Sequence, residues 1–272
     1  MKHRTLILTA FMALTATMLA SCEFSRSDLK IMVKSSQGKD SYRDSDKWGK
    51  VTTKPIDTGT DDITSITVDG SADVDIEQAE SISIEVEGNE KAIDGHAIEI
   101  KDDELYVYNR KDQKYKNCPS IKIKIKAPNI NKVTINGAGD VDIEKDYTID
   151  NTLNVTINGA GDVEAESLTC ENMNITIHGA GDMNAKKVKC KNAAEIQVSG
   201  AGDIKADIEA NSINASISGA GDANLKVDCN NLYASVSGTG DIVLKGKCIN
   251  FKKHESAKGS IDSRSLKYSR KN

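Results

Sequence analysis

Gly137-Ala-Gly-Asp140 decides the fold, because this stretch returns at regular intervals along the chain. A sixth copy, Gly238-Thr-Gly-Asp241, differs only in its second residue. The four other identical copies are Gly159–Asp162, Gly179–Asp182, Gly200–Asp203 and Gly219–Asp222. The first glycines of successive copies lie 22, 20, 21, 19 and 19 residues apart. Such a period is typical of stacked supersecondary units that each bury an apolar face against the next.

The sequence between two copies alternates apolar and polar residues. Ile175 and Ile177 precede the copy that begins at Gly179, and Val188 and Cys190 follow it with the same alternation. This is the pattern of half-buried strands. Each pair of glycines permits a sharp turn, because glycine reaches positive φ without a Cβ clash. The pattern predicts three short strands per period, joined by tight corners.

Neighbouring units repeat the same apolar positions, so each strand is expected to pair in parallel with its copy, roughly 4.8 Å away. We predict an all-β protein with a right-handed parallel β-helix-like solenoid at residues 132–262. One coil takes about 20 residues. A smaller, irregular β region precedes it at residues 61–131, with Gly70-Ser-Ala-Asp73 as a degenerate corner. An antiparallel sandwich with the same hairpin period is the alternative.

The aspartate of each copy is a candidate site residue. In a turn, aspartate accepts hydrogen bonds from backbone N–H groups one or two residues on. In a stack, neighbouring carboxylates repel each other by on the order of 1 kcal/mol in water. Local N–H groups offset this repulsion in the favoured interpretation, and a ladder of bound cations is the alternative. The six residues are Asp140, Asp162, Asp182, Asp203, Asp222 and Asp241.

The first residues form an export signal. Lys2 and Arg4 precede an apolar run from Leu6 to Ala20, which is too short to span a bilayer. The run ends in Leu19-Ala-Ser-Cys22, which resembles a bacterial lipobox. We therefore predict a lipoprotein signal peptide at residues 1–21 and a lipid on Cys22 that anchors the chain in a membrane of the cell envelope, the outer membrane.

The rest of the N-terminal segment and the far C-terminus are predicted to lie outside the β regions. Residues 22–60 are predicted to be the lipidated cysteine and a flexible tether, with Trp48 as its docking point, and residues 263–272 to be a basic tail. Removal of Lys2 and Arg4 with the signal changes the net charge to −5 − 2 = −7. This acidic balance argues against a nucleic-acid partner.

Four cysteines occupy matching positions in adjacent units. Cys170 and Cys190 form one pair in register, and Cys229 and Cys248 form another, within disulfide range. Buried thiols are favoured over two disulfides, because a parallel register orients the Cβ atoms poorly for a bridge. The spacing does not fit a zinc site, and no metal or other cofactor is predicted.

Catalytic signatures do not stand out in the sequence. A polysaccharide-active enzyme needs aromatic residues to grip sugars, and between Val133 and Asn250 the aromatics are Tyr147 and Tyr233. We predict a non-enzymatic binding module for an unidentified protein or glycan, with a structural envelope component as the alternative. Tyr106 and Tyr108 share one strand face and are the candidate ligand surface; the other interpretation places them in the core.

The motifs before the repeats form an ordered set: Gly70-Ser-Ala-Asp73-Val-Asp-Ile76, Ile82-Ser-Ile-Glu-Val-Glu-Gly88, Leu105-Tyr-Val-Tyr108 and Ile121-Lys-Ile-Lys-Ile-Lys-Ala-Pro128. Together with the lipobox and the serial Gly-Ala-Gly-Asp copies, this set resembles the head GIN domain family of Bacteroidetes, also called putative auto-transporter adhesins, over about residues 60–262. The resemblance implies an all-β, parallel β-helix-like fold, an envelope location and an adhesin role. It supplies no catalytic residues.

Overall fold

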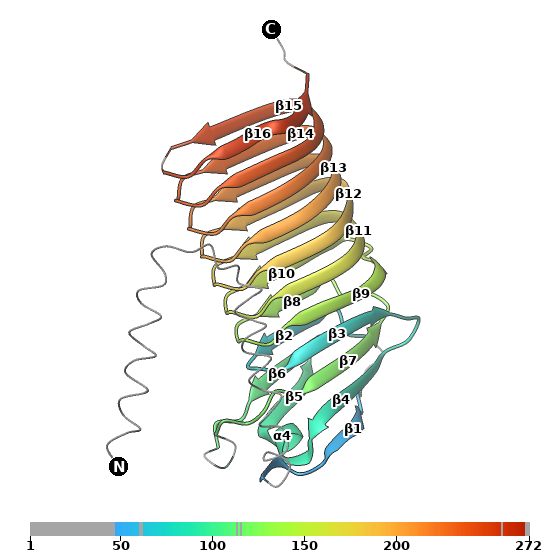
Figure 1. Cartoon of the computed structure of the whole chain (residues 1–272). Helices are drawn as coiled ribbons and strands as arrows, with labels where there is room; N and C mark the ends of the chain where they lie inside the picture. The colour runs from blue at the N-terminus through green and yellow to red at the C-terminus, as the bar shows by residue number, and fades with distance from the viewer. Residues whose placement is uncertain (1–46, 60–61, 113, 115, 257, 270–272) are drawn as a thin grey trace, which may run out of the picture. The chain divides into compact units, whose positions relative to one another are not determined.

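The computed structural model describes residues 47–59, 62–112, 114, 116–256 and 258–269. The predicted signal peptide, Cys22 and most of the predicted tether lie outside these residues. The described residues from Trp48 onward form one compact unit, in which successive coils stack from the end that carries β1 and α4 to β16 (Figure 1). In the described part of the chain, no helix has the length and apolar character needed to cross a membrane.

The unit is almost entirely β-structure. Its elements are β1 (Val51–Ile56), β2 (Ser65–Asp69), β3 (Asp73–Gln78), β4 (Ser83–Asn89), α4 (Glu90–Gly95), β5 (His96–Lys101), β6 (Glu104–Asn109), β7 (Lys122–Ala127), β8 (Lys132–Ile135), β9 (Val141–Thr148), β10 (Thr152–Ile157), β11 (Val163–Ile177), β12 (Met183–Val198), β13 (Ile204–Ile217), β14 (Ala223–Val236), β15 (Ile242–Glu255) and β16 (Ile261–Tyr268). The predicted all-β solenoid, preceded by a smaller β region, is confirmed.

Parallel pairing between equivalent residues builds the stack. Val163 pairs with Met183, which pairs with Ile204, and the same register continues through β16. Among the described strands, antiparallel pairing is confined to the smaller β region, where β1 pairs with β4, β4 with β7 and β5 with β6. All described strands belong to one 16-stranded sheet that wraps around a single apolar core.

Each later coil contains one long strand, not the three short strands that we expected. β12, for example, runs for 16 residues from Met183 to Val198. Its in–out alternation breaks at Lys186–Lys187 and again at Lys191–Asn192, where two consecutive residues are exposed. The chain bends at these two places, where its pairing with a neighbouring coil shifts register, and the pairing resumes on either side, so one strand covers three flat runs.

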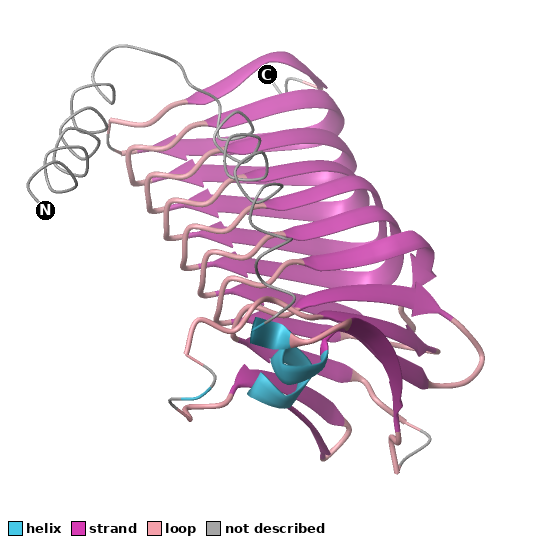
Figure 2. Cartoon of the chain, turned by 60° about the horizontal axis from the view of Figure 1, so that its bottom comes forward, coloured by secondary structure: helices cyan, strands magenta, loops and turns pink. Residues whose placement is uncertain are grey.

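The Gly-Ala-Gly-Asp stretches form the third corner of each coil, and their loops stack in register along one edge (Figure 2). We expected the corner glycines to serve a positive φ, but their φ angles are not positive. The lack of room for a Cβ atom explains why glycine stands at these corners. A Cβ on Gly181 would overlap the carbonyl oxygen of Gly161 and lie 2.9 Å from Ile157 Cγ2. At the glycine positions, the backbones of adjacent corners approach too closely for any side chain.

The N-terminal boundaries differ from the prediction. Trp48 is 3% exposed, and Val51–Ile56 forms β1 on the edge of β4, so the predicted tether is ordered from about residue 48. Burial of the indole and the edge pairing hold this segment. The division at residue 131 also disappears, because the Gly70 corner stacks directly beneath Gly137: Ala138 N–H donates to Gly70 O at 2.7 Å. The degenerate corner is thus the first rung.

The predicted basic tail is mostly the last rung, since β16 pairs with β15 as far as Tyr268. The last part of β15 has no partner in β16. There, charged residues stand in the column that is apolar in the previous coil: Lys253 aligns with Ala234, and Glu255 with Val236. Lys253 Nζ lies 3.1 Å from Glu255 Oε1, which accepts the Ile261 N–H at 2.6 Å. These two charged side chains are exposed at the open end of the otherwise apolar column, and charges at such a position end a sheet without inviting further pairing.

Candidate binding surfaces

The corner aspartates form a continuous hydrogen-bonded ladder. Their carboxylates accept the backbone N–H of the equivalent residue in the next coil, and not an N–H one or two residues on as expected. The donor–acceptor distances are 3.1 Å from Asp140 to Asp73, 2.9 Å from Asp162 to Asp140, 2.9 Å from Asp182 to Asp162, 2.8 Å from Asp203 to Asp182, 2.8 Å from Asp222 to Asp203 and 2.7 Å from Asp241 to Asp222. The side chain thereby satisfies a donor that the corner leaves without a backbone carbonyl.

Both ends of this ladder are degenerate. At the C-terminal end, Ser260 donates its N–H and its hydroxyl to Asp241 Oδ1, at 2.7 and 2.9 Å, and carries no carboxylate onward. At the N-terminal end, burial raises the pKa of Asp73, against the hydrogen bond from Asp140. Among the described residues, no group of three or more His, Cys, Asp or Glu side chains could hold a metal ion. The hydrogen bonds between successive coils give the ladder a structural role.

The paired cysteines are free thiols in one inward-facing column. Cys170 pairs with Cys190 and Cys229 with Cys248, as predicted, and Ala210 pairs with Cys229 between them. The Sγ atoms of Cys170 and Cys190 are 3.4 Å apart and hydrogen-bonded. All four side chains are between 4% and 7% exposed. They fill the core as small apolar residues.

These thiols should resist alkylation while the chain is folded. The hydrogen bond to Cys170 and burial raise the pKa of Cys190, and burial raises the pKa of Cys229 to about 12. The same hydrogen bond lowers the pKa of Cys170, which is protected by its burial. A buried thiol that stays protonated is a poor nucleophile. We expect iodoacetamide at pH 8 to leave these four side chains unmodified in the native chain and to modify all of them in urea, as read by peptide mass. Rapid native labelling of Cys190 or Cys229 would contradict this arrangement.

Tyr106 and Tyr108 point outward from β6. Leu105 and Val107, which alternate with them, are at most 1% exposed and lie in the core. The interpretation that placed the tyrosines in the core is therefore wrong, and their predicted outward position is correct. β6 lies between β2 and β5 near the N-terminal end of the stack, so both rings lie on the outer face of the sheet.

Glu104 organises the surroundings of Tyr106. Its carboxylate accepts hydrogen bonds from Thr67 Oγ1 at 2.5 Å and from Tyr106 Oη at 2.8 Å, and Lys132 Nζ lies 3.4 Å away. Burial acts against ionisation, but these three partners together lower the pKa of Glu104. The carboxylate is thus ionised at neutral pH. Its hydrogen bond raises the pKa of Tyr106, which keeps the phenol protonated as a donor.

Tyr108 is held in the same way by the neighbouring strand. Its hydroxyl donates to Glu99 Oε1 at 2.6 Å, and this bond raises the pKa of Tyr108. We call Glu99, Glu104, Tyr106, Tyr108 and Lys132 the tyrosine patch. Two carboxylates hold the two rings in place, and the patch presents apolar ring surface beside ionised and hydrogen-bonding groups.

A polar face continues from the tyrosine patch along the stack. It consists of the outward residues on the strands that precede each corner, and it is dominated by amides and hydroxyls. The register aligns Thr67, Thr134, Thr156, Thr176, Gln197, Ser216 and Ser235 in one column and Lys132, Asn154, Asn174, Glu195, Asn214 and Tyr233 in the next. Tyr233 is 42% exposed, so the face carries aromatic rings near both ends.

A family model described as "Putative auto-transporter adhesin, head GIN domain" matches residues 62–207 and 185–271. These ranges include the tyrosine patch, the corners and the last rung. The chain belongs to this family. The family resemblance inferred from the ordered motifs is therefore correct. The description of the head GIN domain family names a putative adhesin and not a reaction. No functionally curated protein matches the sequence.

Solved structures share the fold along most of the chain. A structure described as a putative adhesin from Bacteroides fragilis is 26% identical, with a TM-score of 0.69 over 79% of this chain and 97% of that one. A "Putative lipid binding protein" from Parabacteroides distasonis is 21% identical, with a TM-score of 0.58 over 82% and 98%. A putative adhesin from the same species is 19% identical, with a TM-score of 0.59 over 79% and 97%. The last two likenesses show the fold alone.

Several residues of these surfaces could not be connected with them from the sequence, among them Glu104, Lys132 and Tyr233. Glu104 and Lys132 are 28 residues apart, and only the parallel pairing of β2 with both β6 and β8 brings them together. Tyr233 was noted as a rare aromatic but was not connected with Tyr106. The signal that could have found it is its position, because it replaces the asparagine that stands at Asn154, Asn174 and Asn214.

Proposed function

We propose that this chain is a lipid-anchored, non-catalytic binding module of the outer cell envelope, and that its tyrosine patch contacts a glycan. Cys22 in its lipobox context supports the anchor, and membership of an adhesin family supports a role in binding. The observation that carries the glycan assignment is the pair of outward rings at Tyr106 and Tyr108, each held by a carboxylate.

The chemistry of the patch suits a sugar. An aromatic ring offers a flat apolar surface for the C–H face of a pyranose, and fixed carboxylates accept hydrogen bonds from its hydroxyls. Because Glu99 and Glu104 already hold the rings, little side-chain entropy is lost on binding. The amides and hydroxyls of the polar face extend this chemistry along the stack, which suits a linear glycan over a single sugar.

Replacement of both rings tests the assignment. Tyr106→Ser together with Tyr108→Ser should reduce binding of the labelled chain to an array of neutral hexose oligosaccharides by about tenfold or more, since each lost ring removes apolar contact worth about 1 kcal/mol or more. Both side chains lie outside the core, so the unfolding midpoint should change little.

Tyr268→Ser provides a matched control, because Tyr268 is 38% exposed on the last strand, away from the patch. Its array signal should equal that of the wild type. Equal signals from the wild type and the double variant would contradict the proposal. So would a wild-type chain that binds immobilised protein but no oligosaccharide.

A structural role in the envelope is the second candidate function. It is favoured by the ion pairs between successive coils, such as Lys186 Nζ to Glu166 Oε1 at 2.6 Å, which use surface charge to reinforce the stack itself. A chain with this role alone would bind no oligosaccharide with either version of the tyrosine patch.

A further inference from the structure

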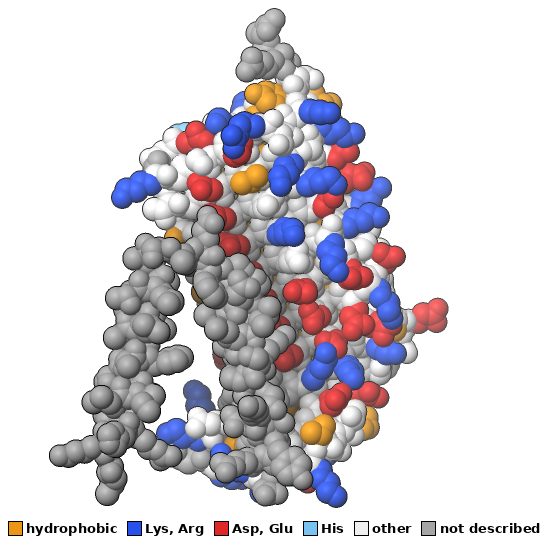
Figure 3. All heavy atoms as spheres, in the orientation of Figure 1, with side chains coloured by type: hydrophobic (Ala, Val, Ile, Leu, Met, Phe, Trp, Pro, Cys, Tyr) orange, Lys and Arg blue, Asp and Glu red, His pale blue; other side chains and the backbone are white. Residues whose placement is uncertain are grey.

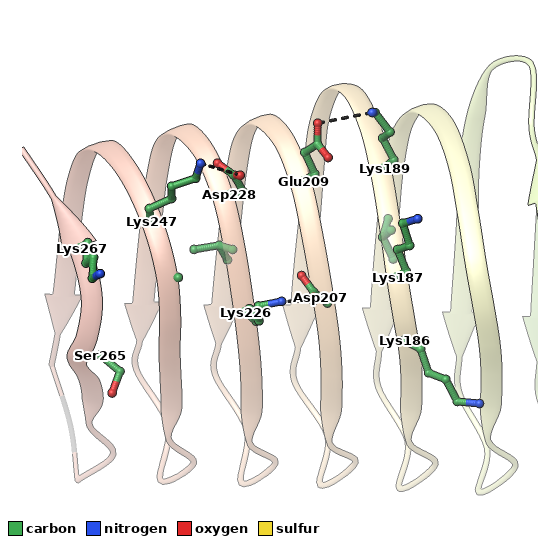
Figure 4. A pocket seen from close by; sticks show the side chains of 13 residues that line it. Lys186, Lys187, Lys189, Asp207, Glu209, Lys226, Asp228, Lys247, Ser265 and Lys267 are labelled. Carbon is green, nitrogen blue, oxygen red and sulfur yellow. Dashed lines mark hydrogen bonds and ion pairs between the residues drawn. The ribbon is translucent and has the colours of Figure 1, made fainter.

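A groove of about 610 Å³ runs along the first bend of the later coils, and its lining comes from five consecutive strands, β12 to β16 (Figure 4). Its charged residues are three acids, Asp207, Glu209 and Asp228, and six lysines, Lys186, Lys187, Lys189, Lys226, Lys247 and Lys267. We call this feature the lysine groove. Its charge is +6 − 3 = +3, in a chain with a net charge of −5.

The lysine side chains gather on one flank of the stack. In Figure 3, blue side chains concentrate over the upper coils on the right of the view, and red side chains over the coils below them. The neighbouring hollow shares Lys186 with the groove and also contains Lys145, but its four acids give it a net negative charge: Asp142, Glu144, Glu164 and Glu166. Charge is therefore segregated along this flank, and the lysine groove is its positive part.

The three acids of the groove are already neutralised. Asp207 lies 2.5 Å from Lys226 Nζ, Glu209 lies 3.5 Å from Lys189 Nζ, and Asp228 lies 3.1 Å from Lys247 Nζ. Lys187 and Lys267 make no ion pair with any described residue. The positive surplus thus consists of Lys187 and Lys267, which face solvent without such a pair, and of Lys186, whose partner Glu166 lies outside the groove at 2.6 Å.

The paired lysines are also accessible to a ligand. Their side chains are between 61% and 68% exposed, and exposed ion pairs of this kind contribute only about 0.2–1 kcal/mol. A lysine can therefore exchange its acid for an external carboxylate at little cost. Gly246 leaves the floor of the groove without a side chain, because its φ of +98° and the nearby Val227 carbonyl exclude one.

We propose that the lysine groove binds an acidic polysaccharide whose anionic groups are carboxylates, such as a uronate polymer. The charges do not converge on one point but extend over four strand spacings, about 19 Å, which suits an extended chain and not a small anion. Lysine is a compact point charge that suits single carboxylates. Arginine and aromatic residues, which single-stranded nucleic acid favours, do not line the groove.

This site is separate from the tyrosine patch, and its test is independent of the proposed function. Isothermal titration of the full chain with polygalacturonate should detect binding at low ionic strength. Binding should weaken at about 0.15 M salt, where the Debye length falls to about 8 Å. The double variant Lys187→Glu and Lys267→Glu should weaken it by about tenfold or more, whereas Tyr106→Ser with Tyr108→Ser should leave it unchanged.

Lys54→Glu together with Lys101→Glu is the matched control, because it changes the net charge equally at exposed positions on β1 and β5. Its affinity should stay within about twofold of the wild type. Equal weakening by both double variants, or no binding by the wild type, would overturn the proposal. Tighter groove-dependent binding of DNA or of anionic phosphatidylglycerol vesicles would overturn it as well. If the reversals impair folding, Lys187→Gln with Lys267→Gln gives the same comparison.

Discussion

Gly181→Val should lower the free energy of unfolding by at least about 4 kcal/mol, a loss reserved for severe disruption of packing. The added Cβ would overlap the carbonyl oxygen of Gly161, which belongs to the rigid backbone of the previous coil. Backbone cannot move aside as a flexible side chain can, so the stack must open at this corner. Urea unfolding followed by circular dichroism gives the measurement.

Ala180→Thr is the control for this prediction. Ala180 lies between the two glycines of the same corner, and the sixth copy places Thr239 at the equivalent position, so the corner accepts a β-branched side chain there. Its stability should stay within about 0.5 kcal/mol of the wild type. If Gly181→Val unfolds at the urea concentration of the wild type, close packing of the corner backbones is not what requires glycine.

Asp162→Ala should lower the free energy of unfolding by about 1–3 kcal/mol, the typical cost of a polar group left without its partner. The substitution removes the acceptor of the Asp182 N–H, which now bonds to Asp162 Oδ1 at 2.9 Å. The corner offers this N–H no backbone carbonyl in exchange. Chemical denaturation again gives the value.

Asp162→Asn separates hydrogen bonding from charge. The amide oxygen keeps the acceptor while the negative charge is lost, so its stability should lie much closer to the wild type than that of Asp162→Ala. Calcium should leave the unfolding midpoint of the wild type unchanged. A midpoint that rises with calcium, and rises less in both variants, would contradict the hydrogen-bonded ladder and favour bound cations.

The repeat made most of the fold predictable. A fixed spacing of Gly-Ala-Gly-Asp copies with matched apolar positions such as Ile175 and Ile196 has few solutions other than parallel stacking, and these two residues do pair. The three straight runs of each coil were also predictable from the sequence, but the sequence did not show that one strand covers all three. At Lys186–Lys187 the pairing with β13 shifts register and then resumes, and sequence alternation alone does not distinguish such a bend from a break between strands.

The ends of the fold were harder to predict, because their rungs lack the repeat. Val51–Ile56 and Ile261–Tyr268 join the sheet through pairing with distant or degenerate partners, which local composition does not reveal. The same reason explains the corner aspartates. Turn chemistry within one corner was the natural expectation, but their partner is an N–H that lies 19 to 22 residues away and becomes a neighbour only in the stack.

The candidate surfaces were predictable only where one strand carries them. Tyr106 and Tyr108 alternate with Leu105 and Val107 on β6, so a shared face was visible in the sequence. The sequence did not decide whether the tyrosines or the two aliphatic residues face the core. The lysine groove joins Lys187 of β12 to Lys267 of β16, and no local pattern connects residues so far apart.

Exposure at the cell surface tests the central claim, a binding module of the outer envelope, most directly. The measurement is digestion of intact cells that carry the chain with proteinase K, followed by detection of the repeat region with an antibody, with lysed cells as the control. We predict that the repeat region is lost from intact cells as well as from lysed ones. Full protection in intact cells, with digestion after lysis, would contradict an outward-facing module and leave the structural role inside the envelope.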